Sequence, residues 1–311
     1  MQKAKHKSVL IYLYLSIFLI LVLITMSAPI AIGLGIIFSL LVRPDNKFIT
    51  RRVSTIPLQI GVVMLGLTIG LKSALDVGNN YFGWITLFVF LSFFGGLVIS
   101  TILKLDKNIS ILISSGAAIC GGTAIAAIAP IIKAKPSDLI LALTIIFIFN
   151  LVALIFFPYI GSFLSMNSAE FGSFVALAVH DTSSVIGTAL EYSTESVEVA
   201  ATLKVARTLW LIPLIILLNF LYKEDNVKSK YPIFVFFFIL AVLVNTSGII
   251  DYEAELKLRF LSQCILMLGL FCIGTQTTLI DFKSLNLKPF VLGFTLWLIA
   301  IPTAYYIVVI A

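Results

Sequence analysis

The sequence predicts an all-α integral membrane protein with about eleven transmembrane helices, built as one polytopic membrane domain over residues 1–311. Hydrophobic residues make up 60% of the chain and charged residues only 12%, whereas a soluble domain carries about 25% charged residues. Apolar segments near the ~20 residues that a bilayer core requires follow one another along the whole chain. Small and polar residues interrupt several of these segments, which is typical of transporters.

Turn signals such as Arg43-Pro44-Asp45-Asn46 and Lys135-Pro136-Ser137-Asp138 separate the apolar segments. The first segment is longer than the 7–15 apolar residues of a signal peptide, so we interpret it as a retained helix. The candidate spans are 8–27, 29–43, 53–73, 81–104, 108–132, 136–160, 169–191, 196–222, 231–247, 256–279 and 286–310.

The distribution of Lys and Arg predicts the orientation. If the N-terminus is cytoplasmic and every span crosses, 14 of the 21 basic residues lie in cytoplasmic segments and two lie within a span. The outer segments hold five: Lys72, Lys133, Lys135, Lys257 and Arg259. This bias predicts a multi-pass protein of a bacterial-type inner membrane, with the N-terminus inside and the C-terminus outside.

Two similar tetrads predict broken helices in related halves. Cys120-Gly121-Gly122-Thr123 lies in the fifth span and Cys272-Ile273-Gly274-Thr275 in the tenth. Segments five spans apart run in opposite directions, so residues 29–160 and 169–310 are candidate inverted repeats after an extra first helix. The alternative is close helix packing through small residues. Met64-Leu65-Gly66-Leu67 also recurs at 267–270 with a different offset, which leaves the register of the repeats open.

Four ionisable residues fall inside predicted spans: His180, Asp181, Lys204 and Arg207. At about 1.5 Å per residue, Lys204 lies roughly 12 Å and Arg207 roughly 16 Å deep in a core about 30 Å thick. Each cation costs about 2.5–3.5 kcal/mol there and therefore requires a partner or cavity water. The spacing puts Lys204, Arg207 and Thr208 on one helix face. An ion pair with Asp181, or a lysine that reaches the interface, is the structural alternative.

The run His180-Asp181-Thr182-Ser183-Ser184 predicts that the seventh span lines water or opens, since five polar residues cannot all face protein on a regular helix. Asn150, by contrast, is interpreted as a helix-to-helix hydrogen bond. The three cysteines are interpreted as small buried apolar residues, with no disulfide framework. The candidate binding residues are Cys120, Gly121, Gly122, Thr123, His180, Asp181, Thr182, Ser183, Lys204, Arg207, Gly274, Thr275 and Gln276.

These residues indicate a secondary transporter for a small anion. Lys204 and Arg207 contribute two positive charges against one negative charge from Asp181, and His180 is taken as neutral. No Walker A motif is present, so ions or protons are expected to drive the cycle, with Asp181 or His180 handling protons. A cation/proton antiporter based on Asp181 is the close alternative. A membrane enzyme is disfavoured because HExxH is absent and nothing orients a Cys120–His180 pair. We expect no cofactor, metal or nucleic acid.

Three motifs resemble the YeiH-type sulfate exporter family: AICGGTAIAA at 118–127 followed by Ala129-Pro130, VHDTSSVIG at 179–187, and KVARTLW at 204–210. That family is grouped with cation/proton antiporters and bile-acid/sodium symporters. The resemblance implies a panel domain, a core domain and two crossed broken helices. A homodimer is a separate expectation. Members often carry Gln at the position of Ser184 and Ser at that of Thr123, which leaves the cargo open between sulfate and sulfonate-like anions.

Overall fold

The computed structural model describes residues 2–43, 48–53, 56–222, 233–276 and 287–310, and all the regular elements in these ranges are helices. The helices are α-helices except η1, a short π-helix that follows α16. In chain order they are α1 (Gln2–Thr25), α2 (Ala28–Val42), α3 (Ile49–Val53), α4 (Ile56–Gly66), α5 (Leu71–Ile102), α6 (Lys107–Ala118), α7 (Gly122–Ile128), α8 (Pro136–Phe163), α9 (Ser168–Ala178), α10 (Thr182–Tyr192), α11 (Thr194–Leu209), α12 (Leu211–Tyr222), α13 (Ile233–Thr246), α14 (Tyr252–Gly274), α16 (Leu287–Tyr305) and η1 (Tyr306–Ile310).

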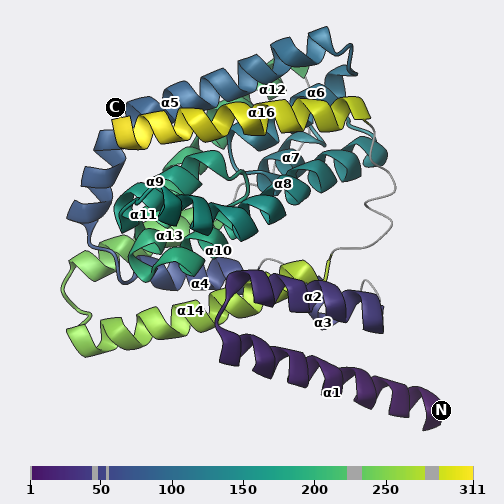
Figure 1. The fold of residues 1–311 in the computed structure, drawn as a ribbon, viewed down its shortest axis with the longest axis vertical. Helices are drawn as coiled ribbons and strands as arrows, with labels where there is room; N and C mark the ends of the chain where they lie inside the picture. Colours follow the sequence, from purple (N-terminus) through teal and green to yellow (C-terminus); the bar gives the residue numbers. More distant parts are fainter. Residues whose placement is uncertain (1, 44–47, 54–55, 223–232, 277–286, 311) are drawn as a thin grey trace.

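The helices form two groups that pack side by side (Figure 1). In the scaffold bundle, α14 lies along α4 and α2, and α13 packs on α4. In the hairpin bundle, α6 packs on α5 and α8, while α9 packs on α11 and α16. The two chain ends lie on opposite sides of the view in Figure 1.

Five helices in the described ranges are long and apolar enough to cross a bilayer, by length and composition. They cover Tyr81–Ile102, Ser137–Phe163, Thr194–Tyr222, Tyr252–Gly274 and Leu287–Ile310. Shorter apolar helices occupy other predicted segments, among them Ile30–Val42 and Ile56–Gly66. The apolar, multi-helix architecture agrees with the expected class, but two of the eleven predicted spans, the fifth and the seventh, fold as hairpins.

Small residues let the scaffold helices approach closely. Gly35 of α2 faces Gly274 of α14, and a Cβ on Gly35 would collide with the carbonyl of Phe271. Gly269 of α14 likewise lies against the backbone of Leu58 in α4. Close backbone contact of this kind drives helix association where lipid removes the hydrophobic driving force.

The segment predicted as the seventh span folds back on itself as a helical hairpin, which we call hairpin 2 (residues 168–192). The backbone leaves helical geometry after Ala178, and α10 begins at Thr182. At the open end, the hydroxyl of Ser193 donates to that of Ser168 at 3.0 Å. The rings of Phe171 and Tyr192 stack at 4.0 Å between centroids. The start of α9 and the end of α10 are therefore neighbours, so this segment does not cross as a single span.

The fifth predicted span folds back in the same way, as hairpin 1 (residues 107–128). A Cβ on Gly116 of α6 would lie 2.8 Å from the end of the Ile125 side chain in α7, although nine residues separate the two. A continuous helix would hold them about 13 Å apart along its axis. Gly121 makes the turn with φ of 59°, a conformation that favours glycine. The break predicted at Gly121-Gly122 is thus present.

A second break lies at Val179–Asp181, in the seventh span, where the polar run at 180–184 predicted that the helix lines water or opens. α14 runs unbroken through Cys272, and Thr275 N–H still donates to Phe271 at 3.0 Å. α14 ends at Gly274, within the predicted tetrad, so the break expected in the tenth span stays a prediction. Residues 277–286 of the tenth span lie outside the described ranges. The hairpins occupy the fourth place of one candidate repeat and the first of the other, so the repeats stay a prediction.

Candidate functional site

The tips of the two hairpins touch. A Cβ built on Gly121 would lie 2.9 Å from both Cα and Cβ of Asp181, so only glycine allows this approach. Helix α8 passes both tips: Leu143 lies beside Gly122, and the side chain of Asn150 accepts a hydrogen bond from the His180 N–H at 3.1 Å. Asn150 thus makes the predicted hydrogen bond to another segment, but its partner lies in the break between α9 and α10 and not in a helix.

The hairpins open toward opposite ends of the bundle. A single residue, Ser193, joins hairpin 2 to α11, which starts the 29-residue apolar segment Thr194–Tyr222. At the far end of that segment, the Tyr222 ring lies 5.1 Å from the ammonium of Lys107, the first residue of α6. The segment therefore runs from the open end of hairpin 2 to the open end of hairpin 1.

Arg207 ties the two hairpins together. Its Nε donates to Ala118 at 2.8 Å and its Nη2 to Ala117, both carbonyls at the end of α6. Its Nη1 donates to Ala176 at 3.0 Å and Leu177 at 2.8 Å, at the end of α9. A helix end leaves carbonyls without partners and carries partial negative charge. The fully buried guanidinium donates hydrogen bonds to these carbonyls and places a positive charge beside the C-termini of both helices.

Lys204, one turn earlier on α11, supports the same tip. Its ammonium donates to the carbonyl of Val179 at 2.9 Å, and its side chain is fully buried, so it does not reach the surface. Neither Lys204 nor Arg207 forms an ion pair with Asp181 among the described residues. The burial cost of both cations is met mainly by backbone carbonyls.

Asp181 begins α10. Its carboxylate accepts the backbone N–H of Ser183 at 3.0 Å, and its side chain is half-buried. Beside it, the hydroxyl of Thr182 and both ring nitrogens of His180 have no hydrogen-bond partner within the described ranges. The Ala117 carbonyl near the His180 ring also accepts from Arg207. Polar groups without partners therefore flank Asp181 in the chain at the contact between the hairpins.

On hairpin 1, the tip holds Cys120, a fully buried free thiol. Gly122 and Thr123 start α7 and are half-exposed, and Gly121 offers no side chain to cap this helix. The structure thus gathers the predicted residues of both hairpins and of α11 in one place. Those residues are Cys120, Gly121, Gly122, Thr123, His180, Asp181, Thr182, Ser183, Lys204 and Arg207.

The remaining predicted residues lie elsewhere. The carbonyl of Thr275 accepts from Nε of Arg51 at 3.1 Å, and its hydroxyl donates to that of Thr50 at 3.0 Å. With Gly274 and Gln276, it belongs to a junction of α14 with α2 and α3, not to the hairpin tips. Sequence reasoning also missed Glu191, whose carboxylate accepts from the Ser27 hydroxyl at 3.0 Å and the Ala28 N–H at 3.1 Å. Its position at a predicted helix end gave no signal of this long-range contact.

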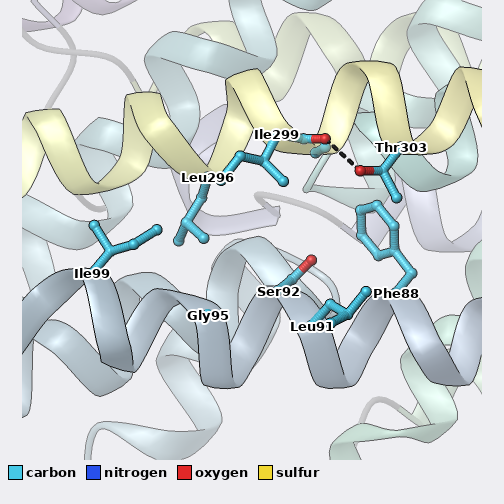
Figure 2. A pocket seen from close by; sticks show the side chains of 9 residues that line it. Phe88, Leu91, Ser92, Gly95, Ile99, Leu296, Ile299 and Thr303 are labelled. Carbon is cyan, nitrogen blue, oxygen red and sulfur yellow. Dashed lines mark hydrogen bonds between the residues drawn. The ribbon is translucent and has the colours of Figure 1, made fainter.

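Two hollows border the hairpin bundle, and neither opens onto Arg207. One lies between α5 and α16, where Figure 2 shows mainly apolar side chains around it, together with Ser92 and Thr303. Phe88 lines this hollow and also covers the guanidinium of Arg207, with its ring centroid 4.8 Å away. The other lies between α5 and α12 and reaches Ile119 at the tip of hairpin 1. In this conformation Arg207 is enclosed by carbonyls and one aromatic ring.

Comparison with known proteins places the chain among membrane proteins. Residues 8–293 match the family model described as conserved hypothetical protein 698. A UPF0324 membrane protein of Bacteroides thetaiotaomicron is 40% identical over 288 residues, which cover 90% of this chain and 86% of the relative. Another, from Porphyromonas gingivalis, is 36% identical, covering 87% of this chain and 83% of the relative. A third, from Photobacterium profundum, is 37% identical, covering 86% of this chain and 82% of the relative. No solved structure matches the chain.

Proposed function

Because the chain belongs to the UPF0324 family of membrane proteins, we propose that its buried polar site serves passage through the bilayer, as a secondary active transporter of a small anion. The observation that carries this proposal is the contact of two oppositely opening hairpins around the buried cations Arg207 and Lys204. Irregular backbone at mid-depth is tolerated where it is buried in protein or lines a cavity, and discontinuous helices form the sites of many carriers.

The charges at the tips favour an anion. Two helix C-termini and two helix N-termini meet there, so their partial charges largely cancel. Lys204 and Arg207 then outweigh the single negative charge of Asp181, with His180 neutral. Because a site of low polarity amplifies a net charge, a small oxyanion such as sulfate or a sulfonate fits better than a cation.

Alternating access would come from movement of the hairpin bundle against the scaffold bundle. The contacts between the two near the open end of hairpin 2 are polar and local. Glu191 holds the start of α2, Arg259 pairs with Glu198, and Gln263 donates to Thr194 at 3.0 Å. Such contacts can break and reform without unpacking either core, and the buried cations would stay bound to the hairpin ends.

The hairpins also sharpen the proposed orientation. Because hairpin 1 returns to the side on which it starts, Lys133 and Lys135 join Lys107 in the cytoplasm. Moving these two residues changes the balance of basic residues from 14 against 5 to 16 against 3. The stronger bias supports a cytoplasmic N-terminus and an external C-terminus.

The test is anion flux in proteoliposomes. We expect purified protein to accelerate the exchange of radiolabelled sulfate, and Thr182→Val to slow it because an unpartnered hydroxyl at the tip is lost. The matched control is Thr188→Val on the same helix, since that buried hydroxyl already donates to the Ser184 carbonyl at 2.7 Å. Rates equal to those of protein-free vesicles for sulfate, sulfonates and phosphate would refute the proposal.

One observation favours a second candidate, cation/proton antiport. Asp181 is a half-buried carboxylate at the contact of the hairpins, a position suited to exchanging a proton for a cation. A pH-sensitive dye inside the vesicles separates the two functions. Proton release on addition of sodium, without any response to sulfate, would select the antiporter.

A further inference from the structure

We propose that the carboxylate of Asp181 acts as an internal anion that occupies the place of the transported anion at the start of α10, so that a proton must bind Asp181 before the anion can bind. This inference rests on the proposed anion transport and specifies its coupling. The proton comes from water on the open side and binds a carboxylate oxygen. It leaves again after the anion has been released.

The first step is the geometry of the α10 N-terminus. The 11-residue helix directs its first N–H groups toward the contact of the hairpins, and the carboxylate of Asp181 takes the N–H of Ser183 at 3.0 Å. Helix N-termini bind oxyanions through these N–H groups and the helix dipole. A carboxylate oxygen and an oxygen of a bound anion compete for the same donor, so one excludes the other.

The second step is independent of the helix. Thr182 is only 7% exposed and His180 only 1% exposed, yet the Thr182 hydroxyl and both His180 ring nitrogens lack partners in the part of the chain that the structure describes. Buried polar side chains in native proteins are almost always hydrogen-bonded. A hydroxyl and a neutral imidazole can each donate one hydrogen bond, which suits the oxygen atoms of a tetrahedral anion.

The third step is charge. Lys204 and Arg207 of α11 face the tips, Cys120 of hairpin 1 lies nearby, and His180 is the neighbour of Asp181 in the chain. With Asp181 ionised, its own negative charge repels a second anion and offsets one cation. With Asp181 protonated, both cations are uncompensated, and the neutral carboxyl competes more weakly for the Ser183 N–H than the carboxylate does. The anion and the proton therefore bind together and travel together.

The experiment measures binding of radiolabelled sulfate to the full-length protein in detergent from about pH 5 to pH 8, where sulfate keeps both charges. Linkage predicts that wild-type affinity falls about tenfold for each pH unit above the titration of Asp181. Asp181→Asn retains an acceptor for Ser183 but cannot ionise, so its affinity should not vary with pH. Asp181→Ser, an equally good cap, serves if the first variant does not fold.

The matched control is Asp251→Asn. Asp251 caps α14 in the same manner, accepting the Ala254 N–H at 2.7 Å, but it is exposed and distant from the tips. This variant should keep the wild-type pH slope. His180→Gln should also keep it, and loss of the slope in that variant alone would assign the proton to His180 and overturn the inference.

The remaining outcomes separate the two proposals. If folded wild-type protein binds no sulfate at any pH, anion transport itself fails. If wild type and Asp181→Asn show the same slope, or wild type shows none, the coupling inference fails while anion transport stands. Complete loss of binding in Asp181→Asn, with an unchanged melting temperature, also overturns it, because the carboxylate would then be a ligand and not a competitor.

Discussion

Arg207→Gln is expected to destabilise the protein strongly, because the guanidinium holds the ends of two helices. The four carbonyls of Ala117, Ala118, Ala176 and Leu177 would lose their charged donor in a fully buried place. At about 1–3 kcal/mol for each orphaned group, the cost is at least about 4 kcal/mol. That is a large part of the about 5–15 kcal/mol that stabilises a typical protein.

The assay is thermal unfolding in detergent, followed with a thiol-reactive dye that reports exposure of the buried Cys120 and Cys272. At roughly 2 °C or more per kcal/mol, we expect the melting temperature to fall by about 8 °C or more. Arg207→Lys keeps the charge but cannot span both helix ends, so it should be intermediate.

The control for this prediction is Arg259→Gln. Arg259 pairs with Glu198 and Glu255 at the partly exposed edge of α14, where an ion pair contributes about 1 kcal/mol or less. Its melting temperature should change by no more than about 2 °C. An Arg207→Gln protein as stable as this control would show that the carbonyls find other donors, and the assignment of Arg207 as the tie between hairpins would be wrong.

Three further predictions concern the glycine contacts and the membrane topology. Gly121→Ala should cost about 2 kcal/mol or more, because φ is positive and the new Cβ meets Asp181, whereas Gly122→Ala, which meets only the end of Leu143, should be tolerated in the same unfolding assay. Gly35→Ala should lower the melting temperature by forcing α2 away from α14, and Gly33→Ala, with open space around it, should not. In a cysteine-free background, an impermeant thiol reagent should label Lys107→Cys and Lys135→Cys from one side of the membrane. It should label Ser165→Cys and Glu195→Cys from the other side. Labelling of positions 107 and 135 from opposite sides would exclude the re-entrant hairpin 1.

The sequence was most informative where a residue is costly in a bilayer. Arg207 and Lys204 stood out because charge at mid-depth requires compensation, and the structure supplies it from carbonyls. The paired glycines at 121–122 indicated a break for a similar reason, since no other residue turns there without strain. Both signals depend only on the residue and its neighbours in sequence, so they can be recognised without the structure.

The direction of the chain after a break could not be predicted in this way. Hydropathy counts apolar residues and cannot distinguish a helix that crosses from two short helices that return. The return of hairpin 2 depends on long-range contacts such as Ser193 with Ser168 and Tyr192 with Phe171. Long-range contact also decides the role of Gly274 in the tetrad at 272–275, which packs closely against Gly35 of α2.

Ser193 ends α10 and caps α11, accepting the N–H of Ser196 at 3.1 Å, so no flexible linker separates the two helices. The Ser196 hydroxyl also donates to the Ser168 carbonyl at 2.9 Å, at the start of α9. Hairpin 2, α11 and the cations that α11 carries are consequently one mechanical unit. A displacement of α11 would therefore move hairpin 2 with it as a rigid body, and the hydrogen bonds of Arg207 would move hairpin 1 in the same direction.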